Sequence, residues 1–323
     1  MNTYAAFLGH QPQLSAAELS AVFPDFTLHA VYDKSVAVFS TAEKIDSSTI
    51  DQLGGTLFIA QSCTEASVDL DDIPQILANE LSNAKRGKVT FSLRTVGLGR
   101  QQVRNLYRDC KDKLKAKGRS SRYVGNERKS AMAVVLFENE ILNPKKGCEL
   151  VVLDDEDQGL WIGRTVAAHN VDAYTKRDME KPVRDTTVGL LPPKLAQIML
   201  NLGRFAALAN ESEERPVKKY AKKHQFTVFD PFCGTGVIPM ECLLRNSHVL
   251  ASDLSLKAVN GCKKNLDWMR KEEKILKKDV SSTVWKQDAR KPFSLKEKPD
   301  VIVTETTLGP PLEKRPPIKD IKK

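Results

Sequence analysis

The sequence of 323 residues lacks features that would assign it to several common classes of protein. It has no C-x-x-C pair, and its cysteines have no histidine partners at the spacing of zinc ligands. This pattern argues against both a disulfide framework and a zinc site. We therefore expect no metal, and reduced, mostly buried thiols at Cys63, Cys110, Cys148, Cys233, Cys242 and Cys262.

Long hydrophobic segments are also missing. No stretch approaches the ~18 apolar residues of a membrane-spanning helix, and the first residues do not join a positively charged region to an apolar one. We find no internal repeat and no low-complexity tract. These absences predict a soluble, cytoplasmic protein without a membrane partner. Its length suggests two or three domains at roughly 100–200 residues each.

The formal net charge of +9 is distributed unevenly along the chain. Residues 1–82 carry two basic and eleven acidic side chains, a net charge of −9, whereas residues 85–129 carry fifteen basic and three acidic ones, a net charge of +12. Such a segment repels itself unless it faces water or a polyanion, so a nucleic-acid backbone is the expected partner. A solvated charged face is the alternative interpretation.

The first sixty residues show the element order of a ferredoxin-like fold. The predicted elements are strand Tyr4–Gly9, helix Ser15–Phe23, a hairpin over Thr27–Phe39, a short helix at Asp46–Leu53 and strand Thr56–Cys63. Ser15-Ala16-Ala17-Glu18 matches a capping box at the start of the first helix, and Pro24 marks its end. Asp33-Lys34 lies at the hairpin turn.

A second α+β region follows, with a helix from Leu70, strand Lys88–Leu93 and a strongly basic helix at about Gln101–Lys117. The apolar stripe of the basic helix is Val103, Leu106, Tyr107, Cys110 and Leu114, and Gly118 is its expected stop. The opposite ridge is the predicted RNA-phosphate contact. We assign to RNA binding Arg94, Arg104, Arg108, Lys111 and Lys115.

Strands are expected next at Ala131–Phe137, Glu149–Leu153 and Leu160–Ala168, with an acidic turn at Asp154–Asp157. A helix opens at Pro192-Pro193, where missing N–H groups cost nothing. Strands and helices then alternate, which predicts a doubly wound parallel sheet. The strands are Phe226–Asp230, His248–Asp253, Thr283–Lys286 and Val301–Thr304, and the helices are Val237–Arg245 and Leu256–Met269.

The first of these strands runs into Asp230-Pro231-Phe232-Cys233-Gly234-Thr235-Gly236 and then a helix. A glycine-bearing turn therefore lies at the carboxyl end of a strand, where doubly wound sheets bind ligands. Gly234 and Gly236 let a cofactor approach the backbone, and Asp230 can accept hydrogen bonds from it. Pro239 replaces the third glycine of a dinucleotide fingerprint, which argues against a pyrophosphate ligand.

Acidic residues follow the next two strands as well. Asp253 in Asp253-Leu254 is suited to holding two ribose hydroxyls, and Asp288 in Asp288-Ala289 follows the third strand. The alternative interpretation is that these are ordinary turn and cap aspartates. The combination resembles the S-adenosylmethionine-dependent methyltransferase superfamily, and this resemblance implies that Asp230–Gly236 bind the donor, Asp253 its ribose, and Asp288 with Ala289 its adenine side.

More closely, the chain resembles the THUMP-containing RNA methyltransferases, which methylate N2 of a tRNA guanine. The resemblance is carried by Leu8-Gly9-His10-Gln11-Pro12-Gln13-Leu14-Ser15-Ala16-Ala17-Glu18-Leu19, by the basic middle region and by Leu191-Pro192-Pro193-Lys194-Leu195-Ala196 through Leu202. It covers essentially the whole chain. It implies that the N-terminal units grip a tRNA acceptor end and that the helix opened by Pro-Lys-Leu-Ala lines the donor pocket.

The expected fold is therefore α/β, with a ferredoxin-like plus THUMP α+β region followed by a partial Rossmann-like, doubly wound methyltransferase sheet. The expected boundaries are 1–63 for the ferredoxin-like domain, 64–170 for the THUMP-like RNA-binding domain, 171–191 for a linker and 192–323 for the methyltransferase domain.

The segment after the fourth strand departs from the family pattern. Family members carry Asp/Asn-Pro-Pro-Tyr/Phe there, whose acid or amide orients the target amine and whose ring stacks on the extruded base. This chain has Glu305-Thr306-Thr307-Leu308 instead, so we assign Glu305 to orienting the amine; a solvated loop glutamate is the alternative. No cysteine follows Pro311, which argues against a cytosine-C5 mechanism.

The superfamily sheet has seven strands in the order 3-2-1-4-5-7-6, and only four are predicted here. The expectation is a truncated frame, a split gene whose second polypeptide supplies the missing strands, or a degenerate protein, so this chain alone would be a weak catalyst. The leading function is S-adenosylmethionine-dependent N2-methylation of a tRNA guanine. The alternatives are a DNA adenine-N6 methyltransferase and a non-catalytic RNA-binding protein.

Overall fold

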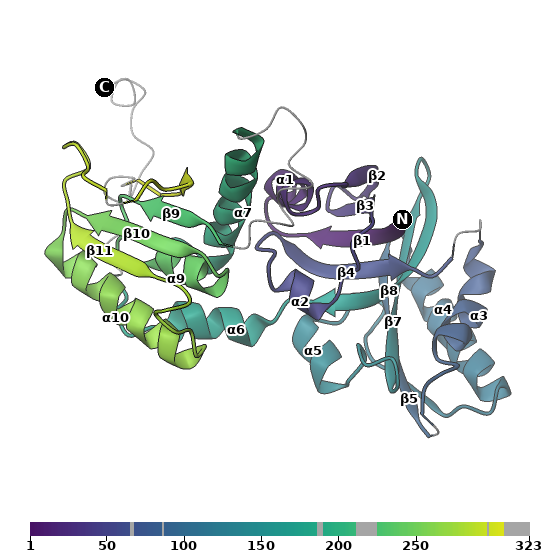
Figure 1. Ribbon diagram of the computed structural model, residues 1–323. Coiled ribbons are helices and arrows are strands. Elements are labelled where there is room, and N and C mark those ends of the chain that lie inside the picture. Colours follow the sequence, from purple (N-terminus) through teal and green to yellow (C-terminus); the bar gives the residue numbers. More distant parts are fainter. Residues whose placement is uncertain (65–67, 86, 186–189, 211–224, 296, 307–323) are drawn as a thin grey trace, which may run out of the picture. The chain divides into compact units, whose positions relative to one another are not determined.

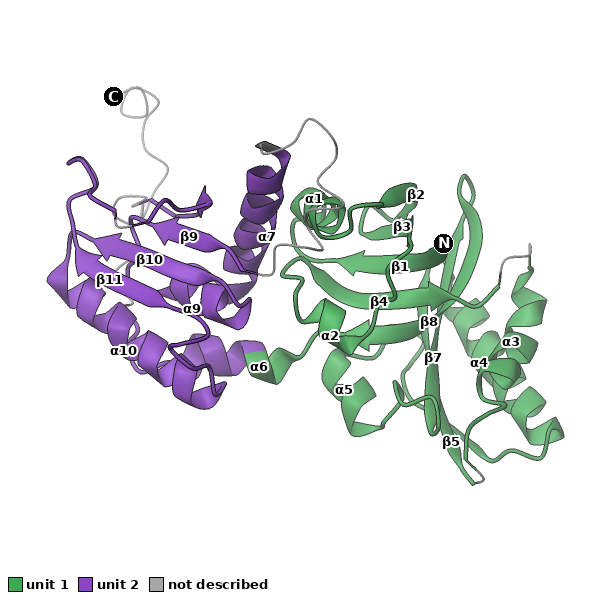
Figure 2. Cartoon of the chain, viewed as in Figure 1, with its two compact units in different colours: residues 1–173 green, residues 174–323 purple. Residues whose placement is uncertain are grey.

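A computed structural model describes residues 1–64, 68–85, 87–185, 190–210, 225–295 and 297–306 (Figure 1). The chain divides into two compact units, Met1–Ala173 and Tyr174–Lys323 (Figure 2). Each is an α/β structure built on its own sheet. Among the described helices, none has the length and apolar character needed to cross a membrane.

The first half of unit 1 has the predicted ferredoxin-like order. Its strands are arranged β2-β3-β1-β4 with every neighbouring pair antiparallel. The elements are β1 (Asn2–Leu8), α1 (Pro12–Val22), β2 (Thr27–Tyr32), β3 (Val36–Thr41), α2 (Ser47–Ile50) and β4 (Thr56–Ser62). Asp33 and Lys34 both have positive φ at the hairpin turn, as their position predicted.

The predicted capping box in this half is wrong. Helix α1 begins at Pro12, so Ser15 lies inside it and its hydroxyl donates to the Gln11 carbonyl oxygen at 3.0 Å. The buried Glu18 carboxylate instead accepts from the amides of Gly54 and Gly55 at 2.9 and 2.7 Å. A residue that suggested local capping thus satisfies two buried amides of the chain before β4.

The second half of unit 1 extends the same sheet through β8, β7, β5 and β6. β4 pairs antiparallel with β8, so the two predicted N-terminal regions share one eight-stranded sheet. The elements are a 3₁₀ turn (Leu70–Asp72), α3 (Ile73–Glu80), β5 (Val89–Val96), α4 (Arg100–Ala116), β6 (Ser121–Tyr123), α5 (Ala133–Glu138), β7 (Gly147–Asp155) and β8 (Gly159–Ala168).

Two details of this half differ from the prediction. The expected strand at Ala131–Phe137 is wrong, because the segment forms the short helix α5, which buries Ala133 and Leu136. A short apolar run suits a buried helix as well as a strand, and periodicity does not separate them. The edge strand β6 was not predicted at all. Helix α4, by contrast, buries Val103, Leu106, Cys110 and Leu114 as expected and ends at Ala116, two residues before Gly118, whose φ is +71°.

The segment predicted as a linker is partly helical. It contains α6 (Val171–Thr175) and a π-helix (Lys176–Glu180), and its later part is held to unit 2. Arg177 Nε lies 2.9 Å from Glu241 Oε1, and Lys176 Nζ lies 2.7 Å from Glu272 Oε2. Mixed charge and a proline suggested a loose connection, whereas these charges find partners within unit 2.

Unit 2 contains the predicted parallel sheet, in the order β11-β10-β9-β12. The elements are α7 (Pro193–Asn210), β9 (Thr227–Asp230), α9 (Val237–Leu244), β10 (His248–Asp253), α10 (Leu256–Glu272), β11 (Ser282–Lys286) and β12 (Val301–Ile302). One apolar core joins Leu200 of α7, Ile238 of α9 and Leu266 of α10 to the strands. The carboxyl ends of β9, β10 and β12 consequently meet at one edge.

Candidate functional site at the carboxyl edge of the parallel sheet

The loop between β9 and α9 is shaped by its two glycines. Gly234 and Gly236 have φ values of +49° and +94°, a region that disfavours other residues. A Cβ atom at Gly236 would lie 2.7 Å from Cys262 Sγ, so this glycine permits α10 to pack closely. A Cβ atom at Gly234 would meet nothing within 4 Å. The backbone at Gly234 is therefore open on the side where a ligand would approach.

The Asp253 carboxylate is fixed against this loop by backbone amides. Its Oδ2 accepts from the amide of Gly234 at 3.0 Å and its Oδ1 from the amide of Ser255 at 2.8 Å. Each oxygen of a carboxylate has room for a second donor. Asp253 thus has a set orientation and two remaining acceptor positions, which fits its predicted contact with a pair of ribose hydroxyls.

Asp230 lies deeper, with 2% of its surface exposed. Its Oδ1 accepts from Thr304 Oγ1 at 2.6 Å and from the Phe232 amide at 3.2 Å. The pKa of Asp230 is raised to about 7, mainly by burial and also by the nearby charges of Asp253 and Glu305, although these two hydrogen bonds lower it. A nearby cation would favour the ionised carboxylate, since opposite charge lowers the pKa of an acid.

Glu305 follows β12 at the same edge and is partly exposed. Its charge acts on Asp230, which places the two carboxyl groups in one neighbourhood. Thr304 connects the end of β12 to Asp230, a role that the sequence interpretation missed. The sequence did contain a signal for this role, because the hydroxyl of Thr304 directly precedes the predicted acid Glu305 after a strand.

The remaining predicted donor residues differ in exposure. Phe232 and Leu254 expose 39% and 59% of their surface, unusual for large apolar residues, whereas Cys233 is buried. Pro231, Thr235 and Ala289 are partly exposed. The exposed apolar side chains of Phe232 and Leu254 offer contact area for an uncharged ring.

Asp288 is engaged by its own neighbour. Arg290 Nη2 lies 2.9 Å from Asp288 Oδ2, and the Arg290 amide also donates to this carboxylate. These hydrogen bonds lower the pKa of Asp288 to about 2. A ligand amine would have to share or displace Arg290 to reach the carboxylate, so Asp288 is less well prepared than Asp253.

Asn265 of α10 supports the donor loop and was not predicted. It is fully buried, and its Nδ2 donates to the carbonyl oxygens of Thr235 at 2.8 Å and Val183 at 2.9 Å. Its Oδ1 accepts from the Val183 amide at 2.9 Å. One side chain therefore ties the glycine loop to Val183. A polar residue within the buried stripe of an amphipathic helix is the signal that could have identified it.

In unit 1, the predicted RNA ridge is only partly free. Arg108, Lys111 and Lys115 are exposed along α4. Arg104 forms an ion pair with Glu127, with 2.7 Å between Nη2 and Oε1. The exposed cations form the continuous part of the ridge.

Arg94 does not lie on this ridge. It is 7% exposed, its Nε lies 3.1 Å from Glu149 Oε2, and its Nη2 donates to the Ala131 carbonyl oxygen at 2.6 Å. Its guanidinium carbon also lies 3.6 Å from the centre of the Phe58 ring. A phosphate contact would require this buried pair to break, so the proposed RNA-binding role does not fit the structure.

Comparisons with known proteins give limited similarities. A family model described as "Conserved hypothetical protein 95" matches residues 209–311, about the region of the donor motifs. No curated protein matches the chain.

Two solved structures are similar to the chain as a whole. TrmN from Thermus thermophilus is 15% identical with a TM-score of 0.49, and the match covers 90% of this chain and 74% of that one. A possible methylase from Clostridium difficile 630 is 12% identical with a TM-score of 0.46, covering 99% and 82%. TM-scores below 0.5 do not extend the likeness to individual residues.

Proposed function

We propose that this chain binds S-adenosylmethionine at the carboxyl edge of its parallel sheet and methylates RNA, with N2 of a tRNA guanine as the target. The observation that supports this most is the arrangement around Gly234, where an open glycine lies between the fixed Asp253 and the buried Asp230. The order β11-β10-β9-β12 brings these residues to the usual ligand edge of a doubly wound sheet.

The residues present fit the donor. Asp253 has two free acceptor positions for ribose hydroxyls, and the exposed Leu254 and Phe232 offer apolar surface for the adenine ring. Asp230 supplies negative charge, when ionised, close to the glycine loop. When bound, the donor supplies an activated methyl group, so the protein's own task is alignment and exclusion of water.

Glu305 is the residue that we assign to the target amine. A carboxylate at the end of β12 can accept a hydrogen from an exocyclic amino group and thereby set the direction of the nitrogen lone pair. Its position near Asp230 brings such an amine to the edge that holds the donor loop. The guanine target rests on the family resemblance, and RNA as partner rests on the exposed cations of α4.

The first experiment is calorimetric titration with S-adenosylmethionine. Loss of charge-assisted hydrogen bonds to the ribose costs roughly 1.5–3 kcal/mol, so Asp253→Ala should weaken binding about tenfold to hundredfold. Asp253→Asn keeps an acceptor for the Gly234 amide, so its affinity should lie between those of the wild type and Asp253→Ala. Asp267→Ala removes a carboxylate that is 65% exposed on α10 and should bind like the wild type. Equal affinity of folded wild type and Asp253→Ala would overturn the donor site.

The second experiment measures transfer of a tritiated methyl group to bulk tRNA, with the modified nucleoside identified after digestion. The expected product is N2-methylguanosine, formed much more slowly by Glu305→Gln. Donor binding without transfer to any RNA would favour the non-catalytic RNA-binding protein. The same assay with DNA as substrate tests the alternative enzyme, because methylation of adenine there would favour a DNA adenine-N6 methyltransferase.

A further inference from the structure

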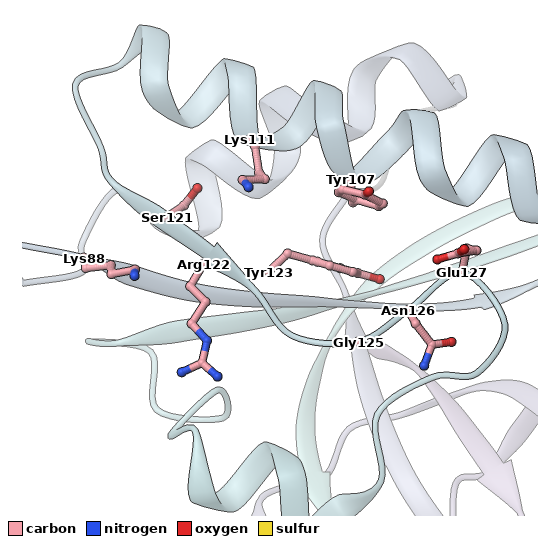
Figure 3. A pocket seen from close by; sticks show the side chains of 9 residues that line it. All are labelled: Lys88, Tyr107, Lys111, Ser121, Arg122, Tyr123, Gly125, Asn126 and Glu127. Carbon is pink, nitrogen blue, oxygen red and sulfur yellow. The ribbon is translucent and has the colours of Figure 1, made fainter.

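Unit 1 contains a pocket of about 420 Å³ between α4, the start of β5, and β6 with the loop that follows it (Figure 3). This volume lies within the range of about 300–1,000 Å³ that is usual for small-ligand sites. The pocket belongs to the basic region, but most of its lining residues lie outside the predicted ridge. Of the predicted RNA-binding residues, only Lys111 contributes to it.

The polar groups at one end of the pocket are cations and a hydroxyl. Figure 3 shows Lys111 reaching down from α4 toward Ser121 of β6, with Lys88 entering from the β5 side. Arg122 also lines the pocket, but its side chain points away from α4. Among the described residues, neither Lys88 nor Lys111 has an ion-pair partner. Two unpaired ammonium groups and one hydroxyl in a concave site favour an anion.

The other end of the pocket is built from aromatic rings and a loop. Tyr107 and Tyr123 stack with 4.7 Å between ring centres and 9° between planes, and Phe91 packs 5.3 Å from Tyr123. This packing fixes the position of the Tyr123 ring. The Tyr123 hydroxyl is buried and has no hydrogen-bond partner among the residues that the structure describes. It is a donor in a set position, and an unmade hydrogen bond there costs free energy.

The loop after β6 passes close to that hydroxyl. Gly125 has a φ of +137°, and a Cβ atom there would lie 3.2 Å from Tyr123 Oη and 3.7 Å from Ser92 Oγ, another buried hydroxyl without a described partner. Asn126 Oδ1 accepts from the amides of Arg128 and Lys129 at 2.8 Å each, which leaves its NH₂ group for a ligand. Glu127, which also lines the pocket, is paired with Arg104.

We propose that this pocket binds the 5′-terminal nucleotide of an RNA strand, with its phosphate at Lys88, Lys111 and Ser121 and its nucleoside toward Tyr123 and Asn126. The inference deepens the proposed function, since it names the part of the RNA that unit 1 holds. The volume exceeds what a phosphate alone fills, because that ion displaces only a few waters of about 30 Å³ each. The exposed Arg108 and Lys115 on the same helix continue the positive surface for the attached strand.

A terminal phosphate fits better than an internal one because of charge. A phosphomonoester carries about −1.5 to −2 at neutral pH, whereas each internal phosphodiester carries −1. Two unpaired lysines therefore match a strand end. The monoester that RNA ordinarily carries lies at its 5′ end.

The experiment compares two otherwise identical RNA hairpins, one with a 5′-phosphate and one with a 5′-hydroxyl, at one fixed salt concentration. The wild-type chain should bind the phosphorylated RNA about tenfold more tightly, since both lysines are exposed and each exposed ion pair strengthens binding only a few-fold. Inorganic phosphate should reduce this ratio toward one. Equal affinity for the two RNAs would overturn the proposal.

Variants assign the preference to the pocket. Lys88→Gln with Lys111→Gln should bring the ratio close to one, and Tyr123→Phe should lower it less. Lys34→Gln with Lys44→Gln is the matched control, because it removes two exposed cations of the ferredoxin-like half that do not line the pocket, and it should keep the full ratio. A ratio that persists in the double variant of Lys88 and Lys111 would overturn the assignment. A third hairpin carries an internal phosphodiester at the same position and no terminal phosphate, so it distinguishes a terminal phosphate from an internal one. If this hairpin bound as tightly as the 5′-phosphorylated hairpin, the result would contradict a strand-end site.

Titration of the same wild-type preparation with S-adenosylmethionine separates this inference from the proposed function. Donor binding without a 5′-phosphate preference would overturn the pocket alone. A 5′-phosphate preference without donor binding would support the pocket and overturn the methyltransferase.

Discussion

The two units hold charges of opposite sign in different ways. In unit 1 the cations of α4 lie on the surface, with Arg108, Lys111 and Lys115 exposed. In unit 2 the carboxylates of Asp230 and Asp253 are held by backbone amides and a hydroxyl at a sheet edge. An exposed positive charge on a surface attracts any polyanion, whatever its detailed structure. A carboxylate held in one orientation selects a particular group on a ligand.

Unit 1 also contains the opposite arrangement, since Arg94 is buried while its sequence neighbours in the basic region are exposed. Arg94 packs against Phe58 and pairs with Glu149, which in turn accepts from Thr165 Oγ1 at 2.6 Å. Both residues are arginines of the basic region, but Arg94 follows the apolar run of β5 whereas Arg108 lies among the charged residues of α4. The comparison between held and free charge can therefore be tested within one unit.

The largest expected effect is the loss of this buried pair. Glu149→Ala leaves Arg94 buried without its partner, and breaking such a pair costs about 3–5 kcal/mol. Hydrogen exchange at the amides of β5 and β7 should accelerate accordingly. Glu127→Ala breaks the Arg104–Glu127 pair, whose side chains are 42% and 27% exposed, and should change exchange little. Equal effects of the two substitutions would show that burial does not separate these pairs.

The sequence predicted unit 2 more accurately than unit 1, for a physical reason. A parallel sheet with short crossovers is encoded by strand–turn–helix segments whose residues are neighbours in sequence, and Gly234, Gly236 and Asp253 all lie in such turns. Their positions follow from local rules. One error in unit 1 concerns a group whose partners are far away in the chain, since Glu18 contacts Gly54 and Gly55. Another concerns Ala131–Phe137, a short apolar run whose periodicity does not separate a helix from a strand.

The candidate site shows the same division. Asp230, Asp253 and Glu305 meet at one edge as the strand order predicts. Thr304 and Asn265 could not be assigned roles, because their contacts depend on the distance between elements rather than on a motif. The pocket in unit 1 was not predicted from the sequence, because β6 has only three residues and its pattern of apolar and polar residues is too short to indicate a strand.

The second effect concerns Asp230 and pH. Because its pKa in the folded chain, about 7, lies above the ordinary 3.8, folding favours the protonated form. Its contribution to stability is therefore fully present below about pH 4 and is lost as pH rises to about 7. Asp230→Asn cannot ionise, so it should be more stable than the wild type by on the order of 2–4 kcal/mol at about pH 8 and by much less at about pH 4.

Urea unfolding of the wild type and Asp230→Asn at several pH values measures this difference. A gap that does not grow between about pH 4 and pH 8 would contradict the raised pKa. S-adenosylmethionine carries a sulfonium cation and should favour ionised Asp230, so its affinity for the wild type should increase over the same range while that of Asp230→Asn stays nearly constant.

The smallest expected effect tests the free charges of unit 1. Arg108→Gln with Lys115→Gln removes two exposed cations from α4 without touching its apolar face, which is formed by Val103, Leu106, Cys110 and Leu114. Each phosphate contact contributes about 0.9 to the slope of log affinity against log salt on a duplex, so the slope for RNA should decrease by about one to two.

A control that replaces the exposed Lys34 and Lys44 of the ferredoxin-like half by glutamine removes the same charge elsewhere and should leave the slope unchanged. If the slope depended on net charge alone, it would decrease equally in the two double variants. A decrease confined to α4 would mean that this helix contacts the phosphates, whereas weaker binding with an unchanged slope would show that the substitutions had disturbed packing instead.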